Sequence, residues 1–376
     1  AAVAAGHEVR AVVRNPAKVR AAAVLHDLQP DGIEVVVADL TDHEALRASL
    51  DGVDALLHAG AVFSLDPRQG RQMRSVNPAS TAVLLDAAAE RDLRRVVYVS
   101  SIGVYAASRT ALGPETPTGP ECGPYTGSKI EADALAVAHQ EAGRPVVVVC
   151  PGGIIGPLDP SPDLSDSMAT VLDGLRRSRV PMPSGACFGM VDVRDVAAVC
   201  VGSLTNGPAP ARHLLAGHLI GPADMLRMAS DLTGRPVRIS SFPAPLLSLT
   251  GALCDLVGRA TGRRMPLGRE VARMTTANMT AGGLQEVDQR SAADAFGFPA
   301  PPPETPLAPT ISWPPSARHP PDAHVAGWPG RGAVAVGPLP RASTRETVSV
   351  ALAFWGRTTA EIVWPLSAKK LNASLV

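Results

Sequence analysis

The sequence predicts an α/β fold built around a doubly wound parallel sheet. Apolar, β-branched runs of strand length recur through the first 150 residues, and each is almost continuously apolar, as expected for strands buried on both faces. Helical patterns separate these runs, and the alternation of strand and helix is typical of parallel βαβ units. The predicted strands are His7–Arg14, Ile33–Leu40, Asp54–Gly60, Arg95–Ser101 and Val146–Cys150.

Three helices are predicted between these strands. The segment Thr41–Glu44 has the spacing of a capping box and predicts a helix over Glu44–Leu50. The long periodic segment Met73–Glu90 predicts a second helix. The third, Tyr125–Ala142, is rich in Ala, Glu and Leu and ends at Gly143.

The pattern changes after residue 150. Helices are predicted over Asp163–Ser178 and Pro245–Thr261, a strand and helix over Val191–Leu204, and a strand, helix and strand over Arg212–Phe242. Thirteen of the 36 prolines then fall between residues 299 and 340, where regular helix is excluded. We therefore expect a dinucleotide-binding region over 1–150, with 191–204 packing on it. A mainly substrate-binding region follows over 151–313, and 314–376 is an irregular, proline-rich tail with some apolar character over 348–355.

Composition excludes several classes of function. The 376 residues carry no formal net charge, so nothing favours a nucleic-acid partner. No apolar run approaches the roughly 20 residues of a membrane helix, so no membrane span is expected. The five cysteines are scattered without metal-site spacing, which favours a reducing cytoplasm and no bound metal.

The beginning of the chain predicts an incomplete fold. Residues 1–9 have the pattern of the last turns of a helix, a glycine stop and a second strand, and no Gly-rich phosphate loop follows any strand. We expect a fragment that lacks the first strand and that loop; the alternative is a true terminus of a fold without them. A missing central strand would leave a gap of roughly 10 Å or force its neighbours to pair. We expect marginal stability and poor NADP(H) binding as a result.

Tyr125 and Lys129 form a Tyr-x-x-x-Lys pair at the start of a predicted helix. At this spacing the two side chains share one helix face, and a nearby ammonium would lower the pKa of the phenol toward neutrality. Lys129 is the only lysine between residues 19 and 368 in a chain that otherwise uses arginine. Because arginine cannot replace lysine in shape, this isolation favours a chemical role for Lys129.

Ser101 follows the predicted strand Arg95–Val99, at the carboxyl end where open α/β sheets bind ligands. A hydroxyl in this place can hydrogen-bond a reacting oxygen. We therefore predict a catalytic set of Ser101, Tyr125 and Lys129.

These residues resemble the catalytic triad of the extended short-chain dehydrogenase/reductase family, in its dihydroflavonol-reductase-like and NAD-dependent epimerase/dehydratase branch. The resemblance covers about residues 1–313 and implies a Rossmann-type fold. It includes Asp39-Leu40, His58–Ala61, Asn77, Pro151–Pro157 and Val191–Ala197, whereas Ala295–Pro299 and Thr310–Trp313 match only loosely.

The resemblance also implies roles for residues that would hold the cofactor. Asp39 would accept a hydrogen bond from the adenine amino group, with Leu40 packing nearby. Ala59 and Gly60 would let the backbone approach the cofactor ribose, and Pro151 would lie near the nicotinamide.

Two basic residues bear on the choice of cofactor. Arg14 stands where an acidic residue would bind the ribose hydroxyls, and with Lys18 nearby it favours the 2′-phosphate of NADP over NAD. The resemblance implies that Lys129 also holds the nicotinamide ribose, beside Tyr125.

Family resemblance leaves the reaction open. Dehydration is disfavoured because Ile102 and Gly103, rather than an acidic residue, follow Ser101. Reduction of a carbonyl, or oxidation of an alcohol, is the favoured expectation, and epimerisation of a nucleotide sugar through a keto intermediate is the alternative. A non-catalytic dinucleotide-binding protein or an inactive fragment forms the contrasting class. Family analogy also suggests a homodimer.

Overall fold

The computed structural model describes the chain in segments. These are residues 1–26, 28–29, 32–64, 67–106, 110–155, 174–177, 179–243, 245–261, 268–280, 287–297 and 347–351. The helix expected over Asp163–Ser178 lies almost entirely outside the described residues. The proline-rich stretch and the segment Thr310–Trp313 lie wholly outside them.

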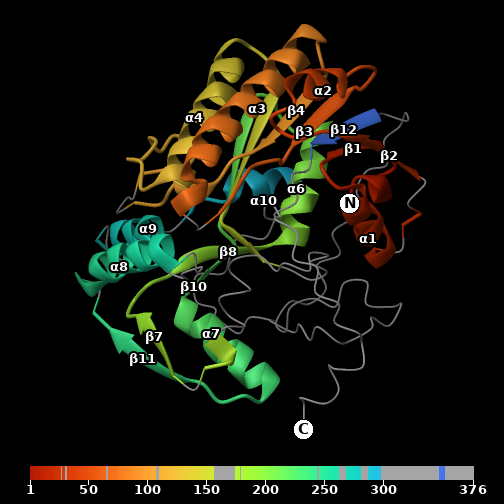
Figure 1. Ribbon diagram of the computed structural model, residues 1–376. Coiled ribbons are helices and arrows are strands. Elements are labelled where there is room, and N and C mark those ends of the chain that lie inside the picture. Colours follow the sequence, from red (N-terminus) through yellow and green to blue (C-terminus); the bar gives the residue numbers. More distant parts are fainter. Residues whose placement is uncertain are drawn as a thin grey trace.

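A parallel sheet of seven strands forms the centre of the described structure (Figure 1), in the order β2-β1-β12-β3-β4-β5-β9. Its strands are β1 Glu8–Val13, β2 Ile33–Val37, β3 Ala55–His58, β4 Arg95–Val99, β5 Val146–Pro151, β9 Ala211–Leu215 and β12 Thr347–Ala351. All six pairings are parallel, which confirms the predicted fold class.

Helices cover both faces of this sheet. One face carries α2 His43–Ala48, α3 Gly70–Glu90 and α4 Pro124–Glu141, and the other carries α6 Val193–Thr205 and α10 Arg290–Phe296. Strand β5 shows how the sequence produces this division. Val146, Val148 and Cys150 pack toward α3 and α4, whereas Val147 and Val149 pack toward α6, because successive side chains of a strand point to opposite faces.

Smaller elements follow the pattern expected after residue 150. Strands β6 Gly153–Ile155, β8 Phe188–Asp192 and β10 His218–Ile220 form a second sheet, and β7 Arg179–Pro183 pairs with β11 Arg238–Phe242. Helix α7 spans Pro222–Thr233, and α8 spans Pro245–Thr261 as predicted. Helices α1 Pro16–Leu25 and α9 Arg269–Thr280 were not predicted. Short 3-10 turns lie at Val3–Ala5, Pro67–Gln69 and Ile102–Val104.

The capping box expected to open the helix over Glu44–Leu50 is wrong by one residue. Helix α2 begins at His43, and the side chain of Asp42 accepts the hydrogen bond of Ala45 N–H at 3.0 Å. Thr41 instead donates its backbone N–H and its hydroxyl to Asp39, at 2.9 and 2.8 Å. Aspartate is as good an N-cap as threonine, and the turn at Asp39 engages Thr41 first.

Strand β12 departs most from expectation. Neither a gap nor direct pairing occurs beside β1, because Thr347–Ala351, in the tail expected to be irregular, lies between β1 and β3 and pairs in parallel with both. Strands β1 and β3 are buried, with Val12 and Leu56 among their core residues. A backbone edge left open there would cost about 1–3 kcal/mol for each unpaired buried group. Filling this position therefore satisfies both neighbouring edges.

We predict that removing residues 347–376 will lower the free energy of unfolding by about 3 kcal/mol or more, because two inner strands lose a partner. Urea denaturation followed by circular dichroism measures the change. Removal of residues 352–376 alone keeps β12 and is the matched control. Equal stability of the two truncated chains would show that β12 does not support the sheet.

Candidate active site

The carboxyl ends of the parallel strands bring the predicted site residues to one edge of the sheet. Ser101 follows β4, Gly60 follows β3, and Pro151 ends β5. Arg14 follows β1, and Asp39 follows β2. Strands β1 and β2 lie on one side of β12, and β3, β4 and β5 lie on the other. The order in which the chain adds strands to the sheet therefore reverses there. Open α/β sheets bind ligands at such a reversal.

Ser101 is held by the turn that it begins. Its backbone is extended, and its Oγ accepts the N–H of Gly103 at 3.1 Å, which caps the 3-10 turn Ile102–Val104. The Ser101 side chain also lies close enough to the Tyr125 side chain to lower the pKa of the phenol. The structure thus brings together a hydroxyl from a strand end and a phenol from a helix start, 24 residues apart in sequence.

Tyr125 lies in the first turn of α4, with the Phe63 ring edge-on at 4.7 Å between centroids. Loss of water around its hydroxyl raises the pKa of Tyr125 to about 12, while the hydrogen bond with Ser101 lowers it and the charge of Glu270 raises it. The lowering toward neutrality expected from the Tyr-Lys pair is therefore not found. At neutral pH the phenol holds its proton.

The position of Lys129 explains why the pKa of Tyr125 is not lowered. Its side chain is buried, and its Nζ donates to the Tyr98 hydroxyl at 3.0 Å and to the carbonyl oxygen of Val99 at 2.9 Å. The ammonium is thus directed to the end of β4. Burial lowers the pKa of Lys129 to about 8, against the opposing charge of Asp133.

Asn77 joins the two helices that flank the site. Its side chain accepts the N–H of Val62 at 2.7 Å and donates to the carbonyl oxygen of Val62 at 2.9 Å. It also donates to the Ser128 hydroxyl at 3.0 Å. The segment after β3, helix α3 and helix α4 are therefore fixed relative to one another beside Tyr125.

Sequence reasoning missed a buried ion pair behind Lys129. Asp133 lies one turn further along α4, and its carboxylate accepts from Ser100 Oγ at 2.5 Å and from Arg212 Nη2 of β9 at 3.0 Å. Arg212 Nη1 also donates to the Tyr105 hydroxyl at 3.1 Å. Only the i+4 spacing of Asp133 from Lys129 could have indicated it, because Arg212 lies 79 residues away along the chain.

Residues expected to hold the adenosine part of the cofactor lie around the ends of β1 and β2. Arg14 Nη1 and Asp39 Oδ2 are 3.7 Å apart, and both side chains are exposed. Burial alone would raise the pKa of Asp39, but hydrogen bonds from Thr41 and the charge of Arg14 leave it lowered. A charged, exposed guanidinium beside a structured turn fits the phosphorylated end of a dinucleotide. Lys18 lies in the first turn of α1, close to Arg14 in sequence.

The remaining cofactor positions suit close approach of a flat ligand. Leu40 is buried after β2, and Ala59 and Gly60 place no large side chain after β3. Pro151 is buried at the end of β5. These residues are small or apolar, as the expected contact with a nucleotide requires.

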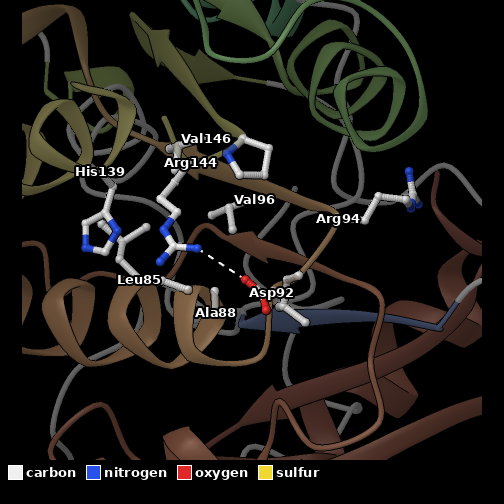
Figure 2. A pocket seen from close by; sticks show the side chains of 11 residues that line it. Leu85, Ala88, Asp92, Arg94, Val96, His139, Arg144 and Val146 are labelled. Carbon is white, nitrogen blue, oxygen red and sulfur yellow. Dashed lines mark hydrogen bonds and ion pairs between the residues drawn. The ribbon is translucent and has the colours of Figure 1, made fainter. Parts of the chain in front are cut away.

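Figure 2 shows a pocket at the opposite edge of the sheet. It lies at the amino ends of β4 and β5, near Val96 and Val146, and the ion pair between Arg144 and Asp92 crosses it at 3.2 Å. None of the predicted site residues lines this pocket. Its position at the amino ends of the strands separates it from the candidate site.

We predict that Asp133→Ala will destabilise the chain by about 3–5 kcal/mol, because it removes the carboxylate that balances the largely buried charge of Arg212. Urea denaturation measures the loss, and exposed Glu131→Ala on the same helix is the control. The double variant Asp133→Ala/Arg212→Met should recover part of the stability. A loss below about 1 kcal/mol for Asp133→Ala would refute a structural role for the pair.

Within the residues that the structure describes, no helix combines the length and hydropathy that crossing a membrane requires.

Comparisons with known proteins place this fold and site in a family. Residues 1–207 match the family described as NAD(P)H-binding. The chain is 30% identical over 273 residues to a sterol demethylase protein B of Methylococcus capsulatus, covering 71% of this chain and 80% of that protein. It is 28% identical over 319 residues to a putative dihydroflavonol 4-reductase of Synechocystis, covering 82% and 88%.

Solved structures show the same fold. The protein gox2253 superposes with a TM-score of 0.59 at 23% identity, covering 78% of this chain and 93% of that one. A UDP-glucuronic acid 4-epimerase from Bacillus cereus, in complex with UDP-glucuronic acid and NAD, gives 0.56 at 14% identity, covering 77% and 93%. At these identities the likeness extends to the fold alone. Taken with the sequence matches, it shows that the chain belongs to the extended short-chain dehydrogenase/reductase family, whose cofactor is NAD(P).

Proposed function

We propose that this chain reduces a ketone or aldehyde group of a small molecule with NADPH, and oxidises the corresponding alcohol in reverse. The observation that carries this proposal is the placement of the Ser101 and Tyr125 side chains close together at the carboxyl end of β4, with Lys129 buried one turn along the same helix. Two hydroxyls that meet in this way can bind one carbonyl oxygen between them.

Tyr125 would act as the proton donor. Its raised pKa keeps the phenol protonated at neutral pH, which is the form required to give a proton to a carbonyl oxygen. Ser101 would hold that oxygen in place. The nicotinamide, when bound, supplies the hydride. Lys129 would hold the nicotinamide ribose from its position at the end of β4.

Two features favour reduction over sugar epimerisation. Relatives of this chain include proteins named cinnamoyl-CoA reductase and a ketoreductase of a farnesyl-dihydroquinoline oxide. Arg14, in addition, supports recognition of a 2′-phosphate and hence of NADPH, which reductases release after each turnover, whereas epimerases retain NAD.

We predict that Tyr125→Phe will lower kcat by at least about 10³-fold, because it removes the group proposed to protonate the carbonyl oxygen. Ser101→Ala should lower it by about 10²-fold, since one hydrogen bond to that oxygen is lost. NADPH oxidation at 340 nm with dihydroquercetin, trans-cinnamoyl-CoA and cinnamaldehyde as probes measures both. Full activity of Tyr125→Phe would disprove the assignment.

Cofactor choice is tested at Arg14. We predict that Arg14→Asp will raise the Kd for NADPH by about tenfold or more, because a phosphate contact becomes a repulsion, while the Kd for NADH changes little. Fluorescence titration measures both constants. Arg20→Ala, on the exposed side of α1, is the control. Equal losses for both cofactors would show that Arg14 does not select the phosphate.

A further inference from the structure

The start of the catalytic helix lacks an ordinary cap. Helix α4 is preceded by Gly123, which has no side chain to accept the free N–H groups of the first turn. Pro124 has no N–H, which leaves those of Tyr125 and Thr126 as the first that need acceptors. The Thr126 hydroxyl accepts from Gly123 N–H at 2.9 Å, so only half of a capping box is present.

A carboxylate from a distant helix completes the cap. Glu270, in the first turn of α9, accepts Thr126 N–H on Oε1 at 2.7 Å and Tyr125 N–H on Oε2 at 3.2 Å. The two oxygens of one carboxylate thus hold both free N–H groups. Glu270 lies 145 residues after Tyr125, and in Figure 1 α9 sits at the end of α4 that carries Tyr125.

Gly123 is matched to this arrangement. A Cβ at position 123 would lie 2.6 Å from Glu270 Cδ and 2.7 Å from its Cβ and Cγ. A capping side chain at 123 and the carboxylate of Glu270 therefore cannot occupy this space together. The glycine is required by close approach rather than by its backbone angles, since its φ of 177° is an extended value open to any residue.

We propose that Glu270 is a positioning residue that caps the catalytic helix from α9 and orients Tyr125. The proposal rests on the proposed function for its catalytic meaning. The carboxylate accepts the backbone N–H groups of Tyr125 and Thr126, so it acts on Tyr125 through the backbone and not on the reacting oxygen. A negative charge at a helix N-terminus is itself favourable, which stabilises the contact between α9 and α4.

The charge of Glu270 has a defined effect on Tyr125. A carboxylate near a phenol opposes loss of its proton, and Glu270 raises the pKa of Tyr125 beyond the effect of burial. Other ionisable groups also surround this contact. They are Lys129 and Asp133 on α4, Tyr98 on β4, Glu121 and Cys122 before α4, Arg74 on α3 and Arg273 on α9.

Glu270→Gln is the first test. The amide keeps one accepting oxygen but loses the charge and the second acceptor, so kcat should fall several-fold while KM for NADPH stays constant. Reduction needs the protonated phenol and is lost as pH rises through the pKa of Tyr125. Without the charge this loss should begin at a pH lower by about half a unit or more. Glu121→Gln, a neighbouring carboxylate without contact to the backbone of Tyr125, is the matched control.

Moving the cap provides the second test. Glu270→Gly removes the carboxylate and its Cβ, and Gly123→Asp in the same chain supplies an ordinary N-cap in the vacated space. The double variant should regain most of the kcat lost in Glu270→Gly. Gly123→Ser in place of Asp should restore rate but not the pH profile, because it returns a hydrogen bond without a charge.

A readout independent of turnover separates this proposal from the proposed function. The chain has three tyrosines, so ¹³C-labelled tyrosine gives three ring signals, and Tyr125→Phe identifies one of them. The titration midpoint of that signal should fall in Glu270→Gln. If neither the midpoint nor the pH profile moves in a folded Glu270→Gln chain, the proposal is overturned. If the midpoint falls but the wild-type chain reduces none of the three carbonyl probes, the proposed function fails and the role of Glu270 stands.

Discussion

A buried parallel sheet needs a hydrogen-bonding neighbour on each side of every inner strand, and the site of this protein depends on that requirement being met between β1 and β3. From β1 the chain adds β2 on one side, and from β3 it adds β4 and β5 on the other. Thr347–Ala351 fills the place between β1 and β3. With β12 in place, the ends of β1 and β2, which carry Arg14 and Asp39, keep their distance from the ends of β3, β4 and β5. The two halves of a dinucleotide site are thereby held one strand apart.

Helix α4 carries three side chains that contact residues at the ends of the sheet strands beside the candidate active site. Tyr125, Lys129 and Asp133 follow one another at i+4 spacing and therefore share one face of the helix. The Tyr125 side chain lies beside that of Ser101, and Lys129 Nζ donates to the carbonyl oxygen of Val99 at the end of β4. The Asp133 carboxylate accepts from Ser100 and Arg212. Val99, Ser100 and Ser101 follow one another at the end of β4, and Arg212 lies on β9. A small shift of α4 would break all three, so the geometry of the site is as rigid as the packing beneath it.

Much of the fold could be predicted because its signals are local. The alternating apolar runs gave five strands of the main sheet, and the helix over Pro245–Thr261 was found at its observed bounds. The predictions from sequence failed for elements whose formation depends on contacts with distant parts of the chain. Helix α9 has few apolar residues, and its stability depends on packing against α8 and on its contact with α4. Strand β12 is only five residues long, and such a short run cannot be distinguished from a loop without its partners.

The sequence by itself determined the fold class and the family and indicated the proposed catalytic residues, because strand periodicity, helix-face spacing and an isolated lysine are visible within short windows. Tertiary structure alone decided which strand completes the sheet, where the ammonium of Lys129 points and which carboxylate caps the catalytic helix. These depend on groups far apart in sequence, from 30 residues between Val99 and Lys129 to 339 between Glu8 and Thr347. The protonation state of Tyr125 belongs with them, because loss of water around its hydroxyl and the nearby charge exist only once the chain has folded.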